Sequence, residues 1–150
     1  NIALCFGAED FTADLGVERT VEGREHFVAR SLIVLAAKAA GIQAIDTVYS
    51  DVQDVEGLSA SAREAMAQGF DGKGVIHPSQ IKSVHAAFCP SPEQIEKAQK
   101  IVAALEEAKA KGSGVVSLGT KMIDAPVVAR AQKTLERARA HGVLGEEEKI

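Results

Sequence analysis

The chain has 150 residues and a formal net charge of −4, and 46% of its residues are hydrophobic. This length suits one ordinary domain, and the apolar fraction allows a packed core. Acidic residues interrupt every basic stretch, so we expect no nucleic-acid partner, which would need a basic surface. No segment of these residues resembles a signal peptide or a bilayer-spanning helix, and we therefore expect a cytoplasmic protein without a membrane partner.

The first predicted element is a strand at residues 2–6, an apolar run that ends at Gly7. Such a run suits a strand buried on both faces of a parallel sheet, and Cys5 within it is expected to be a small core residue. Glu9 and Asp10 follow in a predicted loop at the C-terminal end of the strand, where α/β folds gather ligands. Two carboxylates there favour Mg²⁺, although a polar loop without function fits the motif equally well.

The chain then alternates between helices and strands. The expected elements are a helix at 24–40 ended by Gly41, a strand at 43–49, a helix at 58–68, a strand at 74–78 and a helix at 79–88. This alternation with short connections indicates an α/β fold with a parallel sheet and right-handed crossovers. Three strands are compatible with an open doubly wound sheet and with part of a barrel.

The pattern changes at residues 89–92, where two prolines interrupt the chain. Ser91 and Gln94 have the spacing of a capping box at the start of a long amphipathic helix. A hairpin with a two-residue turn and a last helix capped by Asp124 complete the chain. We therefore divide the chain into residues 1–89 and residues 90–150, a helix–hairpin–helix unit that needs another surface to dock on.

Three blocks of sequence together resemble a known family. They are Gly7-Ala8-Glu9-Asp10-Phe11-Thr12-Ala13-Asp14-Leu15-Gly16, then residues 70–81 (FDGKGVIHPSQI), then residues 121–128 (KMIDAPVV). In order and spacing they resemble the C-terminal half of the citrate lyase beta-subunit and malyl-CoA lyase family, within the HpcH/HpaI aldolase superfamily. The resemblance covers nearly the whole chain.

The family implies a TIM-type (β/α)8 barrel followed by a C-terminal lid. Residues 1–89 would supply barrel strands six to eight, and residues 90–150 would be the lid. A full barrel takes about 250 residues. We therefore expect that about five strands, one of which carries a second metal-binding glutamate, lie upstream of Asn1.

The resemblance also implies roles for individual residues. Asp10 would bind Mg²⁺, and the backbone N–H groups of Ala8, Glu9 and Asp10 would hold the carboxylate of an α-oxo acid. His77 and Pro78 would lie near the CoA arm of the substrate. These five residues form the predicted substrate and metal site.

Two roles are predicted for Asp124. From the residues alone it is a helix cap. The family implies that it also reaches the active site of a neighbouring subunit and takes part in proton transfer, and hence that the protein is a homo-oligomer, a trimer or a multiple of it. Asp46, Asp51 and Asp54 could line the barrel mouth, but we expect them to be solvated loop carboxylates. The histidines on predicted helices, His26, His85 and His141, are expected to be structural.

These roles imply a Mg²⁺-dependent carbon–carbon lyase. It would cleave or form a 3-hydroxyacyl-CoA such as malyl-CoA, citramalyl-CoA or a citryl thioester, with an acyl-CoA and an oxo acid as the other partners in the reaction. The retained lid with Asp124 favours malyl-CoA or citramalyl-CoA. A Schiff-base aldolase would need a lysine at the C-terminal tip of a strand. Lys73 precedes its predicted strand, which favours the metal route independently of the family.

Other functions stay open. A malyl-CoA thioesterase uses much the same site. If only these 150 residues exist, half a barrel exposes strand edges, and the chain would then be a noncatalytic fragment or an assembly subunit. A phosphate-binding α/β domain is disfavoured, because the glycine cluster at residues 112–114 precedes a hairpin and not a helix.

Overall fold

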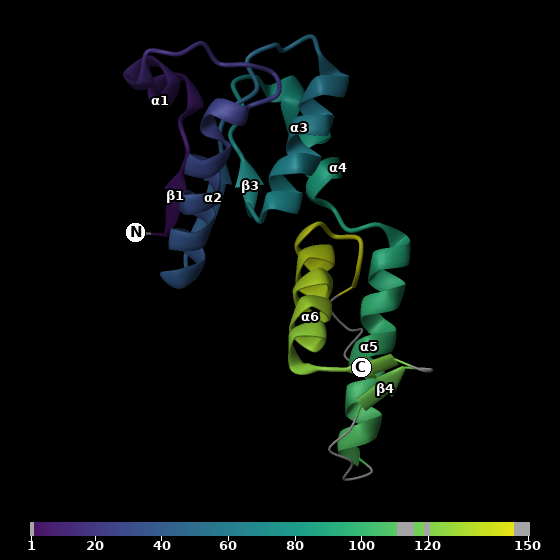
Figure 1. The fold of residues 1–150 in the computed structure, drawn as a ribbon. Helices are drawn as coiled ribbons and strands as arrows, with labels where there is room; N and C mark the ends of the chain where they lie inside the picture. The colour runs from purple at the N-terminus through teal and green to yellow at the C-terminus, as the bar shows by residue number, and fades with distance from the viewer. Residues whose placement is uncertain (1, 111–115, 119–120, 146–150) are drawn as a thin grey trace. The chain divides into compact units, whose positions relative to one another are not determined.

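A computed structural model of the protein describes residues 2–110, 116–118 and 121–145 (Figure 1). The chain divides into two compact units, Asn1–Phe88 and Cys89–Ile150. Each unit has its own elements and its own hydrophobic core, and the two are described separately. None of the helices in these described ranges combines the length and apolar character needed to span a bilayer.

The first unit alternates between strands and helices. Its elements are β1 (Ala3–Cys5), α1 (Ala8–Leu15), α2 (Arg24–Ala39), β2 (Gln43–Asp46), α3 (Val55–Gln68), β3 (Gly72–Lys73), a 3₁₀ turn (Pro78–Gln80) and α4 (Ile81–Phe88). The three strands are parallel and lie in the order β1-β2-β3. The predicted α/β unit with a parallel sheet is confirmed.

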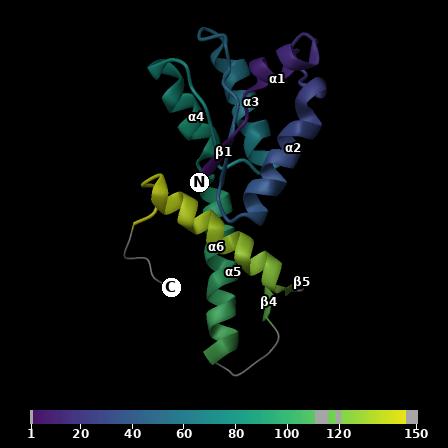
Figure 2. The same ribbon diagram turned by 90° about the vertical axis from the view of Figure 1, so that its left-hand side faces the viewer.

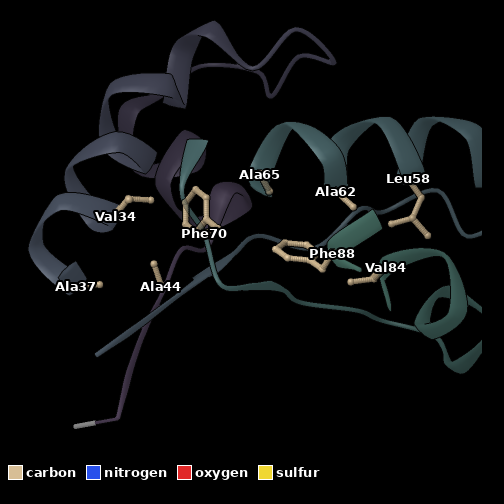
Figure 3. Close-up of a cluster of buried hydrophobic side chains, with 9 residues drawn as sticks. All are labelled: Val34, Ala37, Ala44, Leu58, Ala62, Ala65, Phe70, Val84 and Phe88. Atoms are coloured by element: carbon tan, nitrogen blue, oxygen red, sulfur yellow. The ribbon is translucent and has the colours of Figure 1, made fainter. Parts of the chain in front are cut away.

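A single hydrophobic core joins the helices to one face of this sheet. Its buried members are Val34, Ala37, Ala44, Leu58, Ala62, Ala65, Phe70, Val84 and Phe88, whose side chains face one another in Figure 3. Ala44 of β2 is fully buried, whereas its neighbours Gln43 and Ile45 are exposed and half-buried. Because side chains alternate along a strand, the α2, α3 and α4 helices cover the face that carries Ala44. Figures 1 and 2 both show α2 running beside β1.

The structure corrects the prediction for residues 2–6. Strand β1 covers only Ala3–Cys5, and Cys5 is exposed instead of buried in the core. Ile2 is 87% exposed, and within this run only Phe6 is buried. The reason is that β1 is an edge strand of the described sheet, and the described helices cover one face only.

Glu9 and Asp10 lie in a helix and not in a loop, which is a second correction. Gly7 is extended, with φ −107° and ψ 97°, and its carbonyl accepts the N–H of Phe11 at 3.1 Å. Helix α1 therefore begins directly after the strand. It ends at Gly16, whose φ of 69° is the left-handed conformation that glycine adopts without strain.

The third strand also lies earlier than predicted. The Asp71 N–H donates to the Ala44 carbonyl at 2.8 Å, and the Gly74 N–H donates to the Asp46 carbonyl at 2.9 Å. The ladder to β2 therefore covers residues 71–74. Val75 and Ile76, the apolar residues that predicted a strand, lie beyond it and are 38% and 53% exposed.

The second unit contains α5 (Pro92–Ala110), the antiparallel pair β4 (Val116–Leu118) and β5 (Lys121–Ile123), and α6 (Ala125–Ala140). The capping box at the start of α5 is confirmed, because the Ser91 N–H donates to Gln94 Oε1 at 2.9 Å and the Gln94 N–H donates to Ser91 Oγ at 3.3 Å. The core contains Ala98, Ile101, Ile123, Ala131 and Leu135. The predicted two-residue hairpin turn lies outside the described residues.

Candidate active site

The candidate site begins where β1 and β2 end. The backbone N–H of Ala8, the first residue of α1, donates to the hydroxyl of Thr47 at 3.1 Å. Thr47 directly follows β2 and is 5% exposed, and Ala8 is fully buried. This hydrogen bond joins residues 39 positions apart in the sequence. It ties the start of α1 to the C-terminal end of the neighbouring strand.

The two carboxylates at the start of α1 differ in their partners. Arg19 Nη1 pairs with Glu9 Oε1 at 2.7 Å, and Arg19 Nη2 donates to the Val48 carbonyl at 2.8 Å. Asp10 is exposed, and within the described residues nothing pairs with its carboxylate or donates a hydrogen bond to it. Asp10 is thus the carboxylate left free for a ligand, and Glu9 is held by an arginine.

Asp10 lies against a glycine. A Cβ atom placed on Gly7 would lie 3.3 Å from Asp10 Oδ2, which is tighter than ordinary van der Waals contact. The absence of a side chain at Gly7 therefore leaves space for the Asp10 carboxylate beside the end of β1.

Two backbone N–H groups at the start of α1 are also available. In a helix, the first N–H groups have no acceptor within the helix. Among the described residues, the amides of Glu9 and Asp10 donate to no acceptor, whereas the third predicted anion-binding amide, that of Ala8, is occupied by Thr47. The positive end of the helix dipole lies at these amides, and it favours an anion there.

The described residues offer one candidate ligand for a metal ion. No group of three or more histidine, cysteine, aspartate or glutamate side chains that could hold a metal exists within the described ranges. Mg²⁺ in proteins commonly uses one or two carboxylates and keeps several waters. The free carboxylate of Asp10 fits one position of such a ligand set, and the chain would supply that one ligand.

An open cleft of about 880 Å³ adjoins Glu9. Its lining comes from α1, residues 17–23, α2, the segment after β2 and α3. Glu9, Arg19 and Thr47 line it, but Asp10, His77 and Pro78 do not, and so the structure does not gather all the predicted site residues in one cavity.

A largely buried ionic cluster forms part of the wall of this cleft, because Arg30, Asp46 and Glu64 line it. Arg30 Nε donates to Asp46 Oδ1 at 2.9 Å, and Lys73 Nζ donates to Asp46 Oδ2 at 2.9 Å. Arg30 Nη1 also donates to Glu64 Oε1 at 2.9 Å, and its guanidinium carbon lies 5.5 Å from the centre of the Phe70 ring. The cluster links β2, β3, α2 and α3.

Burial and pairing act in opposite directions on the two cations of this cluster. Burial by itself lowers the pKa of Arg30, but the hydrogen bonds and charges of Asp46 and Glu64 together outweigh burial, and the pKa lies above its usual value. For Lys73 burial is the larger effect, so its pKa lies below the usual value despite the opposing charge of Asp46. Asp46 therefore holds both cations in a region with little water.

Two predictions about this cluster were wrong. Asp46 was expected to be a solvated loop carboxylate, but it is 2% exposed. Asp46 lies two positions after Ala44, and alternate residues of a strand share one face. The sequence could therefore have indicated that Asp46 lies on the covered face of β2. Lys73 was expected before its strand, but it is the last residue of β3, paired in register with Asp46.

The position of Lys73 therefore does not exclude Schiff-base chemistry. What disfavours Lys73 as a nucleophile is its environment, because its side chain is fully buried and its ammonium is paired with Asp46. Lys73 is also absent from the lining of the cleft. We assign it a structural role.

The other predicted site residues have visible structural roles. His77 is exposed, and its Nδ1 accepts the N–H of Ser79 at 3.2 Å, so that it caps the 3₁₀ turn that begins with Pro78. Asp124 caps α6, as predicted, because its Oδ1 accepts the N–H of Val127 at 3.1 Å. Asp124 belongs to the second unit.

Asp51 and Asp54 line the cleft. The carboxylate of each accepts hydrogen bonds from neighbouring groups. Asp51 Oδ1 accepts the N–H groups of Gln53 and Asp54 at 2.9 and 3.2 Å. Asp54 caps α3 through the Gly57 N–H at 2.8 Å and accepts a 2.5 Å hydrogen bond from the Tyr49 hydroxyl. The hydrogen bond from Tyr49 lowers the pKa of Asp54.

The family of this chain follows from its likeness to known proteins. The HpcH/HpaI aldolase/citrate lyase family matches residues 2–78, which contain the sheet, the Ala8–Thr47 hydrogen bond and Asp10. The chain belongs to the HpcH/HpaI aldolase/citrate lyase family.

Individual members of the HpcH/HpaI family are similar over most of the chain. Citrate lyase subunit beta of Haemophilus influenzae is 48% identical over 139 residues, which are 93% of this chain and 48% of that protein. The mitochondrial citramalyl-CoA lyase of Homo sapiens is 45% identical over 136 residues, 91% of this chain and 40% of that protein. The chain spans about half the length of the curated relatives it matches.

A solved structure shows the same fold. The CitE protein of Mycobacterium tuberculosis, in complex with magnesium, acetoacetate and coenzyme A, superimposes with a TM-score of 0.75 at 40% identity. The match covers 92% of this chain and 52% of that one.

Proposed function

We propose that the full-length protein is a Mg²⁺-dependent carbon–carbon lyase. It cleaves or forms a 3-hydroxyacyl-CoA thioester, with an acyl-CoA and an oxo acid as the other reaction partners. The observation that carries this proposal is the free carboxylate of Asp10 beside two unoccupied backbone amides at the tip of α1. Relatives named as lyases, and a related structure that holds magnesium, acetoacetate and coenzyme A, support it.

In this proposal the first unit is the C-terminal part of a TIM-type barrel. Strands β1, β2 and β3 are barrel strands six, seven and eight, and residues 90–150 are the lid. The parallel order of the strands and the placement of α1 at the C-terminal end of β1 support this, because TIM barrels carry their active sites at that end.

Each residue of the proposed site then has a specific role. Asp10 holds the metal, which when bound polarises an oxygen of the oxo acid as a Lewis acid. The amides of Glu9 and Asp10 bind the oxo-acid carboxylate and orient it beside Asp10. His77 and Pro78 contact the CoA arm. Asp124 exchanges a proton with the α-carbon of the acyl group.

The proposal extends to assembly and substrate. Asp124 acts in the site of a neighbouring subunit, so the enzyme is a homo-oligomer, a trimer or a multiple of it, and it works in the cytoplasm. We favour malyl-CoA or citramalyl-CoA as the thioester. A relative named citramalyl-CoA lyase supports this class.

The test compares wild-type full-length protein with Asp10→Asn and with Asp14→Asn, the exposed aspartate one turn later in α1. Malyl-CoA, citramalyl-CoA and citryl-CoA are each incubated with and without Mg²⁺, and the products are separated. We expect Mg²⁺-dependent release of an acyl-CoA and an oxo acid from wild type and Asp14→Asn, and none from Asp10→Asn. Full activity in Asp10→Asn would overturn the proposal, and release of free CoA with a hydroxy acid would identify a thioesterase.

A further inference from the structure

We propose that Thr47 is a positioning residue, whose hydroxyl holds the start of α1 so that Asp10 and the two free amides face the ligand. This inference rests on the proposed function of Asp10. Thr47 touches neither reacting atoms nor the metal in this proposal, and it acts through the Ala8 N–H alone.

Helix α1 needs an external acceptor at its first residue. The helix has only eight residues, and its N-cap Gly7 has no side chain to accept a hydrogen bond. Ala8 is fully buried, so without Thr47 its N–H would be cut off from water and from any partner. An unsatisfied buried N–H is costly. Thr47 therefore supplies from the next strand the cap that serine or threonine usually supplies within a helix.

Thr47 itself is held firmly. It directly follows Asp46, which is 2% exposed and paired with both Arg30 and Lys73. The backbone at this point also accepts a hydrogen bond from the Gly74 N–H at the Asp46 carbonyl. The backbone at Asp46, directly before Thr47, is thus fixed by a buried ion cluster and by the strand ladder.

The hydroxyl of Thr47 sets the direction of the neighbouring groups. In a helix, consecutive N–H groups point the same way along the axis, so the orientation of the Ala8 N–H determines those of Glu9 and Asp10. The Asp10 side chain lies back toward Gly7, within the same turn. A hydrogen bond at Ala8 therefore orients all the groups at the tip of α1 that the proposed ligands contact.

The first measurement uses the wild-type full-length protein without metal. Amide hydrogen exchange is followed by NMR at residues 8, 9 and 10. We expect slow exchange at Ala8, because its N–H is buried and bonded, and fast exchange at Glu9 and Asp10. An Ala8 amide that exchanges as fast as that of Asp10 would overturn the inference, and this result needs no variant to fold.

The second measurement compares Thr47→Val, which removes the hydroxyl at nearly constant volume, with Thr47→Ser, which keeps it. Thr134→Val is the control, because it deletes a threonine hydroxyl that donates to a backbone carbonyl in the second unit. Mg²⁺ is titrated into each protein and followed at the Asp10 amide resonance. We expect Thr47→Val to weaken Mg²⁺ binding by about tenfold or more, as loss of an outer group that orients a metal ligand does. Thr47→Ser and Thr134→Val should bind Mg²⁺ as the wild type does.

The outcomes separate a positioning role from a structural one. A structural role alone would lower the melting temperature of Thr47→Val and leave its Mg²⁺ affinity and Ala8 exchange unchanged, and that result would overturn the inference. Asp10→Asn tests the underlying function separately. If Asp10→Asn still binds Mg²⁺ like the wild type, the proposed function fails; if it does not bind while Thr47→Val does so normally, only the role of Thr47 fails.

Discussion

Lys73 Nζ lies 2.9 Å from Asp46 Oδ2, with exposed side-chain fractions of 0% and 1%. The other oxygen of Asp46 accepts Arg30 Nε at 2.9 Å. One buried carboxylate, at the last residue of β2, therefore pairs with a cation from β3 and with a cation from α2. The strand ends on which the candidate site depends are held together by charge as well as by hydrophobic packing.

Loss of the Asp46 carboxylate should strongly destabilise the folded protein. Asp46→Asn leaves Lys73 and Arg30 buried without their shared counter-charge, and loss of one partner of a buried pair costs about 3–5 kcal/mol. Urea unfolding of the full-length protein measures the change in the free energy of unfolding. The control is Glu96→Gln, whose pair with Lys100 is exposed on α5 and whose loss should cost about 1 kcal/mol or less. Equal losses in the two variants would show that the buried pair contributes nothing special.

Gly57→Ala should destabilise the protein, although alanine is the better helix former. A Cβ at Gly57 would lie 2.0 Å from Asp54 Oδ2 and 2.2 Å from the Tyr49 hydroxyl oxygen, and both groups would have to move. The movement breaks the Asp54 cap of α3, and loss of a cap costs about 0.5–2 kcal/mol. The free energy of unfolding measured in urea checks this. Adding Tyr49→Phe, which removes one of the two crowding oxygens, should restore part of the loss, whereas a more stable Gly57→Ala protein would show that the clash is absorbed elsewhere.

The lowered pKa of Glu25 implies that part of the protein's stability is lost in acid. The Thr20 backbone N–H donates to its Oε1 at 2.9 Å, and this bond, with the Thr20 hydroxyl and His26, lowers the pKa of Glu25 from 4.5 to about 2. Because the folded pKa lies below the unfolded one, the stabilisation is present above about pH 4.5 and is lost as the pH falls toward 2.

Melting temperatures of wild type and Glu25→Gln across this pH range test the effect. The wild type should be the more stable protein at pH 6, and the difference should shrink steadily between pH 4.5 and pH 2. Glu22→Gln, which changes an exposed glutamate nearby, provides the control curve. A difference between wild type and Glu25→Gln that does not vary with pH would contradict the role of the Glu25 carboxylate.

Asp124 allows its two roles to be separated. Asn, Asp and Ser cap helices about equally well, whereas Ala costs about 1 kcal/mol. Asp124→Asn should therefore keep the stability of the α6 cap and lose carbon–carbon cleavage of the CoA thioester, because an amide cannot exchange the proton with the α-carbon. Asp124→Ala should lose both, although the fold remains. An active Asp124→Asn enzyme would mean that Asp124 is a cap and nothing more.

The local elements of this protein could be predicted from its sequence. The Ser91–Gln94 capping box, the Asp124 cap and the left-handed Gly41 that follows α2 each depend on residues within a few positions of one another. The parallel sheet could also be predicted, because the alternation of helices and strands is visible along the sequence. Three short motifs also sufficed to indicate the family, because such motifs are contiguous in the sequence.

The tertiary structure alone decided how the site is built. The Thr47–Ala8 hydrogen bond spans 39 positions and the Lys73–Asp46 pair spans 27, and no local pattern specifies such partners. For the same reason the sequence could not show that the Ala8 N–H donates to Thr47 or that Arg19 pairs with Glu9. It also could not show that the Asp10 carboxylate has no partner among the described residues. A carboxylate acquires its role from the groups that surround it, and those groups are brought together only when parallel strands align their ends.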